Sequence, residues 1–133
     1  MPLPTYATAE SAGFDLSASA EVTVAPRQIA LVPTGLVIEV PSGYFLGIFA
    51  RSSTPLKRGL MVANGVGVID PDYAGPHDEV RIQVLNISTS DVTIKPGDRL
   101  AQGIVLPAPR VSWEEETVSL RQETRGGFGS TGQ

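Results

Sequence analysis

The chain has 133 residues, of which 41% are hydrophobic and 18% charged, so it is expected to fold as one compact domain rather than stay disordered. A formal net charge of −4 argues against a protein that binds the nucleic-acid backbone through a basic face. The absence of cysteine excludes disulfides and thiolate metal sites, and no apolar run is long enough to span a membrane. A soluble, cytoplasmic protein is therefore expected, with no membrane or nucleic-acid partner.

Short segments in which apolar and polar residues alternate recur along most of the chain. Alternation with a period of two places successive side chains on opposite faces of a strand. The predicted strands are centred on residues 22–24, 29–31, 36–40, 44–48, 80–84, 92–94 and 99–106. Fourteen glycines and eleven prolines supply the turns between them. The spacing predicts an all-β fold, an antiparallel sandwich or barrel.

Only one short helical turn is expected, around residues 52–59, where Ser53 could cap the helix and Pro55 sit in its first turn. The alternation ends after the Pro-Ala-Pro segment, although three apolar residues could still dock on a neighbour: Trp113, Val118 and Leu120. The prediction is one β domain over residues 1–120, followed by a flexible tail over residues 121–133.

The first candidate functional residue is Asp15, in the segment "SAGFDLSA". It lies in a strand-like stretch whose small neighbours allow another chain or a ligand to come close. The alternative is an ordinary carboxylate in a turn or on an edge strand, and the segment taken alone favours that alternative.

The second candidate is "ARSS", in which Arg51 precedes Ser52 and Ser53 at the end of an apolar strand. A guanidinium, two hydroxyls and free backbone N–H groups are the donors that a phosphate chain needs. A helix cap beside a surface arginine explains so short a motif equally well.

The third candidate is "NGVGVIDPDYAG", where Asp70 and Asp72 flank Pro71 and Tyr73 follows. Alternation places the two carboxylates on the same side if the strand stays regular, and such a pair can hold a water as a general base. The alternative is a hairpin loop, because Asp-Pro-Asp is a common turn composition.

The fourth candidate is the tail "RGGFGSTG". Its glycines and hydroxyls can wrap a triphosphate, Arg125 adds charge, and Phe128 can stack on a base. It lacks the lysine and the strand-to-helix setting of a Walker loop, and the alternative is a flexible terminus. Together, the four segments indicate a nucleotide phosphate hydrolase that uses Mg²⁺ carried by its substrate.

These segments, in this order, resemble the five motifs of the trimeric dUTPase family (deoxyuridine 5′-triphosphate nucleotidohydrolases). The five are "AGFDLSA", "ARSS", "GVIDPDYAG", "GDRLAQ" and "GGFGSTG", which together span nearly the whole chain. The resemblance implies a jelly-roll homotrimer with active sites shared between subunits. It also implies hydrolysis of dUTP to dUMP and pyrophosphate by attack of water on the α-phosphorus, with Mg²⁺ as cofactor, which limits the incorporation of uracil into DNA.

The resemblance also implies a role for each matching residue. Asp70 would be the general base, and Asp15 would hold Mg²⁺ through water. The phosphates would be bound by Arg51, Ser52, Ser53 and Gln102. Uracil would be read by Asn64 and the backbone of Val68 and Ile69, while Tyr73 would pack against the deoxyribose. In the tail, Phe128 would stack on uracil and the terminal phosphates would be enclosed by Gly129, Ser130 and Thr131, with further substrate contacts from Arg81 and Arg125.

The sequence departs from the family pattern in four places. It starts at "MPLPTYAT" without a leading strand, so part of one sheet is expected to be missing or contributed differently. Ala50 replaces a frequent proline, which is expected to soften the turn before Arg51. Residues 75–80 lengthen the third motif next to Arg81, and the tail has fewer residues than usual after Arg125.

Two other functions fit parts of this pattern. A dCTP deaminase of the same fold would have a longer chain and a different third motif, so "DPDYAG" favours a dUTPase. A non-catalytic module that binds dUTP as a switch would be expected to lack Asp70 or the tail, and both are present. A purely structural jelly roll explains the strands but leaves the glycine-rich tail unexplained.

Overall fold

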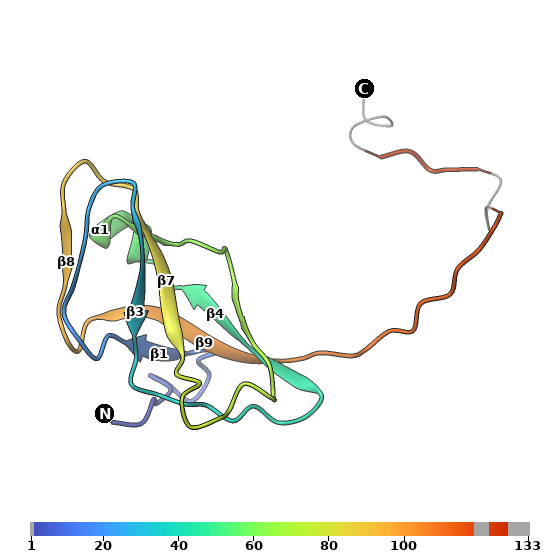
Figure 1. Ribbon diagram of the computed structural model, residues 1–133, viewed down its shortest axis with the longest axis horizontal. Helices are drawn as coiled ribbons and strands as arrows, with labels where there is room; N and C mark the ends of the chain where they lie inside the picture. The colour runs from blue at the N-terminus through green and yellow to red at the C-terminus, as the bar shows by residue number, and fades with distance from the viewer. Residues whose placement is uncertain (1, 119–122, 128–133) are drawn as a thin grey trace.

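Nine strands and one short helix make up the described part of the chain, residues 2–118 and 123–127, in this computed structural model (Figure 1). The helix is α1 (Thr54–Arg58). The strands are β1 (Phe14–Ser17), β2 (Val22–Val24), β3 (Ile29–Pro33), β4 (Tyr44–Ala50), β5 (Leu60–Val62), β6 (Gly67–Ile69), β7 (Arg81–Asn86), β8 (Val92–Ile94) and β9 (Arg99–Pro107).

The strands pair in a nested order. β1 pairs with β9, β2 with β8 and β3 with β7, and all of these pairs are antiparallel. β4 lies between β9 and β6, so the sheets read β1-β9-β4-β6, β2-β8 and β3-β7-β5. Pairing of first with last and second with second-last strands is the connectivity of a jelly roll, in which two sheets cover one core. The predicted all-β fold is confirmed.

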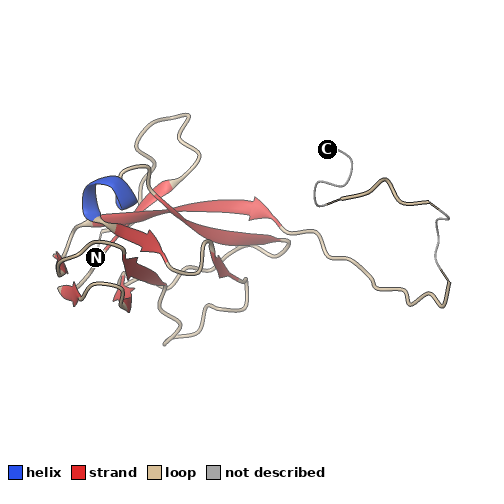
Figure 2. Ribbon diagram, turned by 90° about the horizontal axis from the view of Figure 1, so that it is seen from above, coloured by secondary structure: helices blue, strands red, loops and turns tan. Residues whose placement is uncertain are grey.

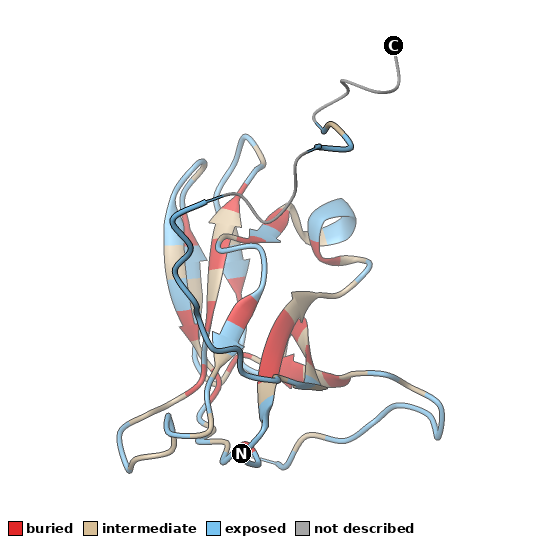
Figure 3. Cartoon of the chain, turned by 90° about the vertical axis from the view of Figure 1, so that its right-hand side faces the viewer, coloured by how far each residue is buried: buried red, intermediate tan, exposed pale blue. Residues whose placement is uncertain are grey.

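The core between the sheets is made of aliphatic side chains that point inward from every second strand position. Figure 3 shows the buried residues concentrated in the strands. The fully buried ones include Leu16, Leu46, Ile82, Val84 and Leu100. Small aliphatic residues can fill such a core because the sheets pack face to face around it.

Residues 36–40 alternate in the way that predicts a strand, but they join no ladder, so that prediction is wrong. The segment is held by the Val80 N–H, which donates to the Leu36 carbonyl at 2.7 Å. Leu36 and Ile38 pack against the core, and Val40 is buried. The alternation therefore reflects burial along one edge of the core without regular pairing.

Helix α1 lies inside the predicted range, with Pro55 in its first turn and Gly59 ending it in the left-handed conformation at φ 68°. Ser53 occupies the N-cap position, but its side chain makes no cap hydrogen bond. The predicted helix is confirmed, and the predicted capping by the Ser53 hydroxyl is wrong. The buried hydroxyl here belongs to Thr54.

After β9 the chain runs away from the sheets as an extended arm. Figure 2 shows the arm leaving at the end opposite α1. Residues 109–118 are all exposed, Trp113 at 92%. The predicted boundary between residues 120 and 121 lies outside the described residues. Within the described ranges, no helix has both the length and the apolar character needed to cross a membrane.

Candidate active site

Residues from the first, second and fourth motifs meet at one end of the four-stranded sheet. The register places Asp15 of β1 opposite Gln102 of β9, and Arg51 directly follows β4. The Arg51 Nε donates to Asp15 Oδ1 at 2.9 Å, and the Gln102 side-chain amide donates to the Ala50 carbonyl at 3.0 Å. The three predicted residues Asp15, Arg51 and Gln102 are therefore neighbours within a single chain.

Arg99 also belongs to this group of side chains, which we call the phosphate cluster after the role proposed for it below: Asp15, Arg51, Arg99 and Gln102. Its Nη1 lies 3.4 Å from Asp15 Oδ2, so the Asp15 carboxylate sits between two guanidiniums. One carboxylate and two guanidiniums leave one excess positive charge. The Asp15 and Arg51 side chains are only 28% and 27% exposed, which reduces solvent screening of that charge. The cluster can thus receive an anion.

The turn that carries Arg51 is fixed by Thr54. The Arg51 N–H donates to Thr54 Oγ1 at 3.1 Å, and the Thr54 N–H donates to the Arg51 carbonyl at 3.0 Å. Ser52 is exposed and Ser53 is half-buried, so Ser52 presents the more accessible hydroxyl beside Arg51. Sequence reasoning missed Thr54, because the run "RSST" does not reveal which hydroxyl turns inward. It also gave no role to Arg99, although Arg99 stands in the fourth motif, "GDRLAQ".

The third motif lies at the other end of β4. Ile69 pairs with Leu46, so Asp70 leaves β6 beside the start of β4, whereas Arg51 follows its end. At about 3.3 Å per residue, the five steps from Leu46 to Arg51 correspond to roughly 17 Å. Asp70 and the phosphate cluster therefore cannot act on one phosphate group within the same chain.

Asp70 begins a turn in which the Tyr73 N–H donates to the Asp70 carbonyl at 3.1 Å. β6 ends at Ile69, so the two carboxylates do not extend from a regular strand, and the turn alternative describes this backbone. Asp70 and Asp72 still line one open hollow of about 540 Å³, together with Tyr44, Phe45 and Arg110. The Tyr73 hydroxyl donates to the Glu79 carbonyl at 2.9 Å.

The two strands before Asp70, β5 and β6, do not pair with each other. β5 pairs with β7 and β6 pairs with β4, so the turn at residues 63–66 connects two different sheets. Asn64 is exposed in this turn, and Val68 is 58% exposed on β6. Since β6 is the edge strand of its sheet among the described residues, part of its backbone faces outward and can hydrogen-bond a ligand.

Arg81 belongs neither to the phosphate cluster nor to the hollow at Asp70. It opens β7 opposite Pro33, and its Nε lies 3.6 Å from Glu79 Oε1. Its side chain is more than half exposed and lines neither the hollow at Asp70 nor the smaller one at Asp15. The added residues before it form a local turn, in which the Gly75 N–H donates to the Asp78 carboxylate at 2.9 Å.

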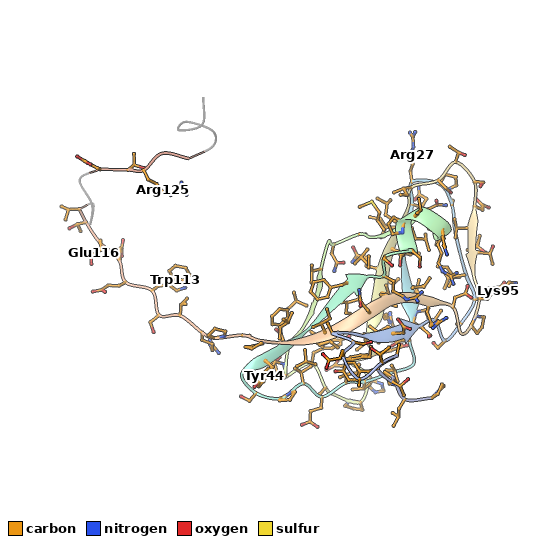
Figure 4. The ribbon with its side chains drawn as sticks, turned by 180° about the vertical axis from the view of Figure 1, so that it is seen from behind. Arg27, Tyr44, Lys95, Trp113, Glu116 and Arg125 are labelled. Carbon is orange, nitrogen blue, oxygen red and sulfur yellow. The ribbon has the colours of Figure 1, made fainter. Side chains whose placement is uncertain are left out.

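Arg125 is exposed on the C-terminal arm, and Figure 4 shows it and Trp113 well away from the sheets. The remaining predicted tail residues lie outside the described residues: Phe128, Gly129, Ser130 and Thr131.

The family model for dUTPase matches residues 1–132. The chain belongs to the dUTPase family. It is 41% identical to a deoxyuridine 5′-triphosphate nucleotidohydrolase of Wolbachia pipientis subsp. Culex pipiens, over 100% of this chain and 88% of that protein. The corresponding protein of Rickettsia akari is 42% identical over 98% of this chain and 88% of its own length. These matches confirm the resemblance to dUTPases.

Solved dUTPase structures share the fold. The dUTPase of Streptococcus mutans superposes with a TM-score of 0.79 at 36% identity, covering 84% of this chain and 89% of that one. A mutant dUTPase from Staphylococcus aureus phage phi11, which coordinates a structural Mg(II) ion, superposes with a TM-score of 0.80 at 20% identity, covering 90% of this chain and 92% of that one. At that identity, the second match supports the fold alone.

The donor set suits a metal that arrives with a dUTPase substrate. Within residues 2–118 and 123–127, no three His, Cys, Asp or Glu side chains are grouped so as to hold a metal ion. The phosphate cluster offers one carboxylate, Asp15, whose oxygens already accept from Arg51 and Arg99. A Mg²⁺ ion held by triphosphate oxygens and water, and contacted by Asp15 through water, fits this arrangement because Mg²⁺ keeps several waters.

Proposed function

We propose that this chain hydrolyses dUTP to dUMP and pyrophosphate as a Mg²⁺-dependent homotrimer in the cytoplasm. One observation carries the proposal. An anion-binding cluster lies at one end of β4, and a hollow lined by Asp70 and Asp72 lies at the other end. The family match over nearly the whole chain supports dUTP as the substrate.

The phosphate cluster binds the triphosphate. Arg51 and the Gln102 amide donate to phosphate oxygens, with Ser52 as an accessible hydroxyl and Ser53 as a weaker contributor. Charge-assisted bonds from a planar guanidinium suit phosphate geometry. Asp15 would hold Mg²⁺ through water, and the bound ion would supply positive charge against the phosphate oxygens.

Asp70 orients the attacking water toward the α-phosphorus and accepts its proton. As the water oxygen bonds to the α-phosphorus, the bond from this phosphorus to the bridging oxygen breaks and pyrophosphate leaves. Asn64 and the outward backbone of Val68 and Ile69 hydrogen-bond the uracil edge. Cytosine would leave buried groups unpaired there, which costs more than losing an apolar contact. Tyr73 packs against the deoxyribose and leaves no room for a 2′-hydroxyl.

The tail completes the site after the substrate has bound. Phe128 stacks on uracil, while Arg125 and residues 129–131 enclose the terminal phosphates. Closure of the tail expels water and so strengthens the phosphate contacts.

The division of the site requires a second copy of the chain. Because Asp70 lies far from its own phosphate cluster, the carboxylate of one subunit serves the phosphate cluster of another. The outer face of the β3-β7-β5 sheet offers a contact surface for this association. There Ile29, Leu85 and Met61 stand in one row across the three strands, with Leu31 beside them.

This outer face is unusually apolar for a solvated surface. Ile29 is 60% exposed, Leu31 52% and Met61 47%. Side chains on the opposite face of the same strands, such as Ile82 and Val84, fill the core. A sheet that is apolar on both faces is expected to be covered on both. We propose that the subunits pack against one another through this outer face.

One assay tests the proposed activity. The purified protein is incubated with each deoxynucleoside triphosphate and with UTP in the presence of Mg²⁺, and pyrophosphate is measured. We expect release from dUTP alone. Ammonia release from dCTP would identify a deaminase instead, and tight binding of dUTP without pyrophosphate release would identify a regulatory module.

A further inference from the structure

A β-bulge in β9 presents two backbone carbonyls to the turn that carries Arg51. The register between β1 and β9 shifts beside Leu100, which has no opposite residue in β1. An extra residue of this kind bends a strand and redirects its backbone groups. The Arg99 carbonyl accepts from Arg51 Nη1 at 3.4 Å, and the Leu100 carbonyl accepts from Thr54 Oγ1 at 2.8 Å.

The Thr54 hydroxyl therefore joins two separate segments. It accepts the Arg51 N–H at 3.1 Å while it donates to the Leu100 carbonyl. The regular ladder between β4 and β9 ends at the pair Ala50 and Ala101. The Thr54 hydroxyl therefore connects Arg51, the residue after β4, to β9 as well. Thr54 is 1% exposed, and a group buried so deeply leaves unpaired polar atoms behind when it is removed.

We propose that Thr54 is a positioning residue that fixes the Arg51 guanidinium for phosphate binding. The inference rests on the phosphate-binding role proposed above for Arg51. Without the hydroxyl, the Arg51 backbone loses its link through Thr54 to the Leu100 carbonyl, and the guanidinium leaves its place beside Asp15. Substrate binding then weakens although Thr54 itself does not touch the substrate.

The test compares Thr54→Val, which removes the hydroxyl at nearly constant volume, with Thr54→Ser, which keeps it. We expect Thr54→Val to raise KM for dUTP about tenfold and to weaken binding of α,β-imido-dUTP by a similar factor, measured by calorimetry. Thr54→Ser should stay within about threefold of the parent. If Thr54→Val does not fold, Thr54→Ala and Thr54→Ser supply the same comparison.

Thr34→Val is the matched control. Thr34 is also fully buried, and its hydroxyl likewise accepts a backbone N–H, from Leu36, and donates to a carbonyl, that of Val80. Both valine variants should lower the melting temperature, but only Thr54→Val should raise KM. A purely structural loss reduces the folded fraction and the apparent kcat while leaving KM unchanged, and that result for Thr54→Val would overturn the inference.

A double-mutant cycle between Thr54 and Arg51 separates this inference from the role proposed for Arg51. If Thr54 acts through Arg51, adding Thr54→Val to Arg51→Gln should raise KM no further. An additive effect on KM would show that Thr54 acts by another route. That result would overturn the inference about Thr54 and leave the role of Arg51 intact. A parent-like KM for Arg51→Gln would refute the phosphate role of Arg51, and the positioning role would fall with it.

Discussion

Mixing two inactive variants should restore activity if each active site is built from different subunits. Asp70→Asn removes the proposed general base, which contributes about 10²- to 10⁴-fold in rate. Arg51→Gln removes a charged phosphate contact, a loss on the order of 100-fold. Each variant alone should therefore be nearly inactive. The two changes lie at opposite ends of β4, so neither disturbs the other's site.

The expected recovery follows from the separation of Asp70 and Arg51 along β4. In a random trimer formed from equal amounts of the two variants, a site works when its carboxylate comes from an Arg51→Gln chain and its guanidinium from an Asp70→Asn chain. For a symmetric head-to-tail arrangement this occurs in about one quarter of the sites. If both residues came from one chain, no site would be restored.

The assay refolds the two variants together from denaturant and measures pyrophosphate release from dUTP. Each variant refolded alone gives the baseline, and parent protein refolded at the same total concentration gives the scale. Recovery near one quarter of the parent rate is the predicted result. A mixture no more active than the better single variant would refute the division of the site between subunits.

Three further changes test the assembly, the tail and the metal. Leu31→Glu should place an unpaired charge in the proposed contact surface, and desolvating that charge costs several kcal/mol. Sedimentation should then detect monomers in place of the trimer, whereas a trimer of unchanged stability would contradict the proposed contact surface. Truncation after Thr124 should leave trimers folded by circular dichroism but nearly inactive, and full turnover would remove the tail from the mechanism. Chelation by EDTA should stop pyrophosphate release reversibly without changing the melting temperature, whereas turnover that persists in EDTA would contradict a role for Mg²⁺.

Much of the fold could be predicted because apolar and polar residues alternate in the sequence of most strands, and the apolar ones are the residues that a strand buries. β7 alternates regularly in burial, with Ile82 and Val84 inward, and β4 and β9 are long enough to show the period although it is interrupted at Gly47 and at the bulge; all three were predicted. β5 and β6 were missed because their sequences, LMV and GVI, show no alternation of apolar and polar residues, whereas the equally short β2 and β8 have a threonine between two apolar residues. Residues 36–40 show the opposite error, because their side chains alternate in burial without a partner strand.

The candidate site could be predicted only where a residue carries its own chemical signal. Asp15, Arg51 and Gln102 stand in motifs, and the structure places them together. Arg99 also stands in a motif, "GDRLAQ", but was given no role, and Thr54 follows directly after "ARSS". The contacts of both residues lie at the bulge beside Leu100, which no periodicity reveals. The separation of Asp70 from Arg51 also depends on register, since it follows from which residue of β4 faces Ile69.

The connectivity brings Asp15, Arg51 and Gln102 together in one chain and keeps Asp70 away from them, which is the basis of the proposed shared site. Nested pairing puts β1 against β9, so residues far apart in the sequence, Asp15 and Gln102, become neighbours through backbone bonds alone. β6 pairs instead with the first half of β4, and the length of β4 then keeps Asp70 away from Arg51. A slip of β6 along β4 by one residue would bring Asp70 only about 3.3 Å closer and would move the inward row of β6 to the solvent face. Bringing in Asp70 from a neighbouring subunit leaves the core intact, which is why a fold of this kind favours a shared site.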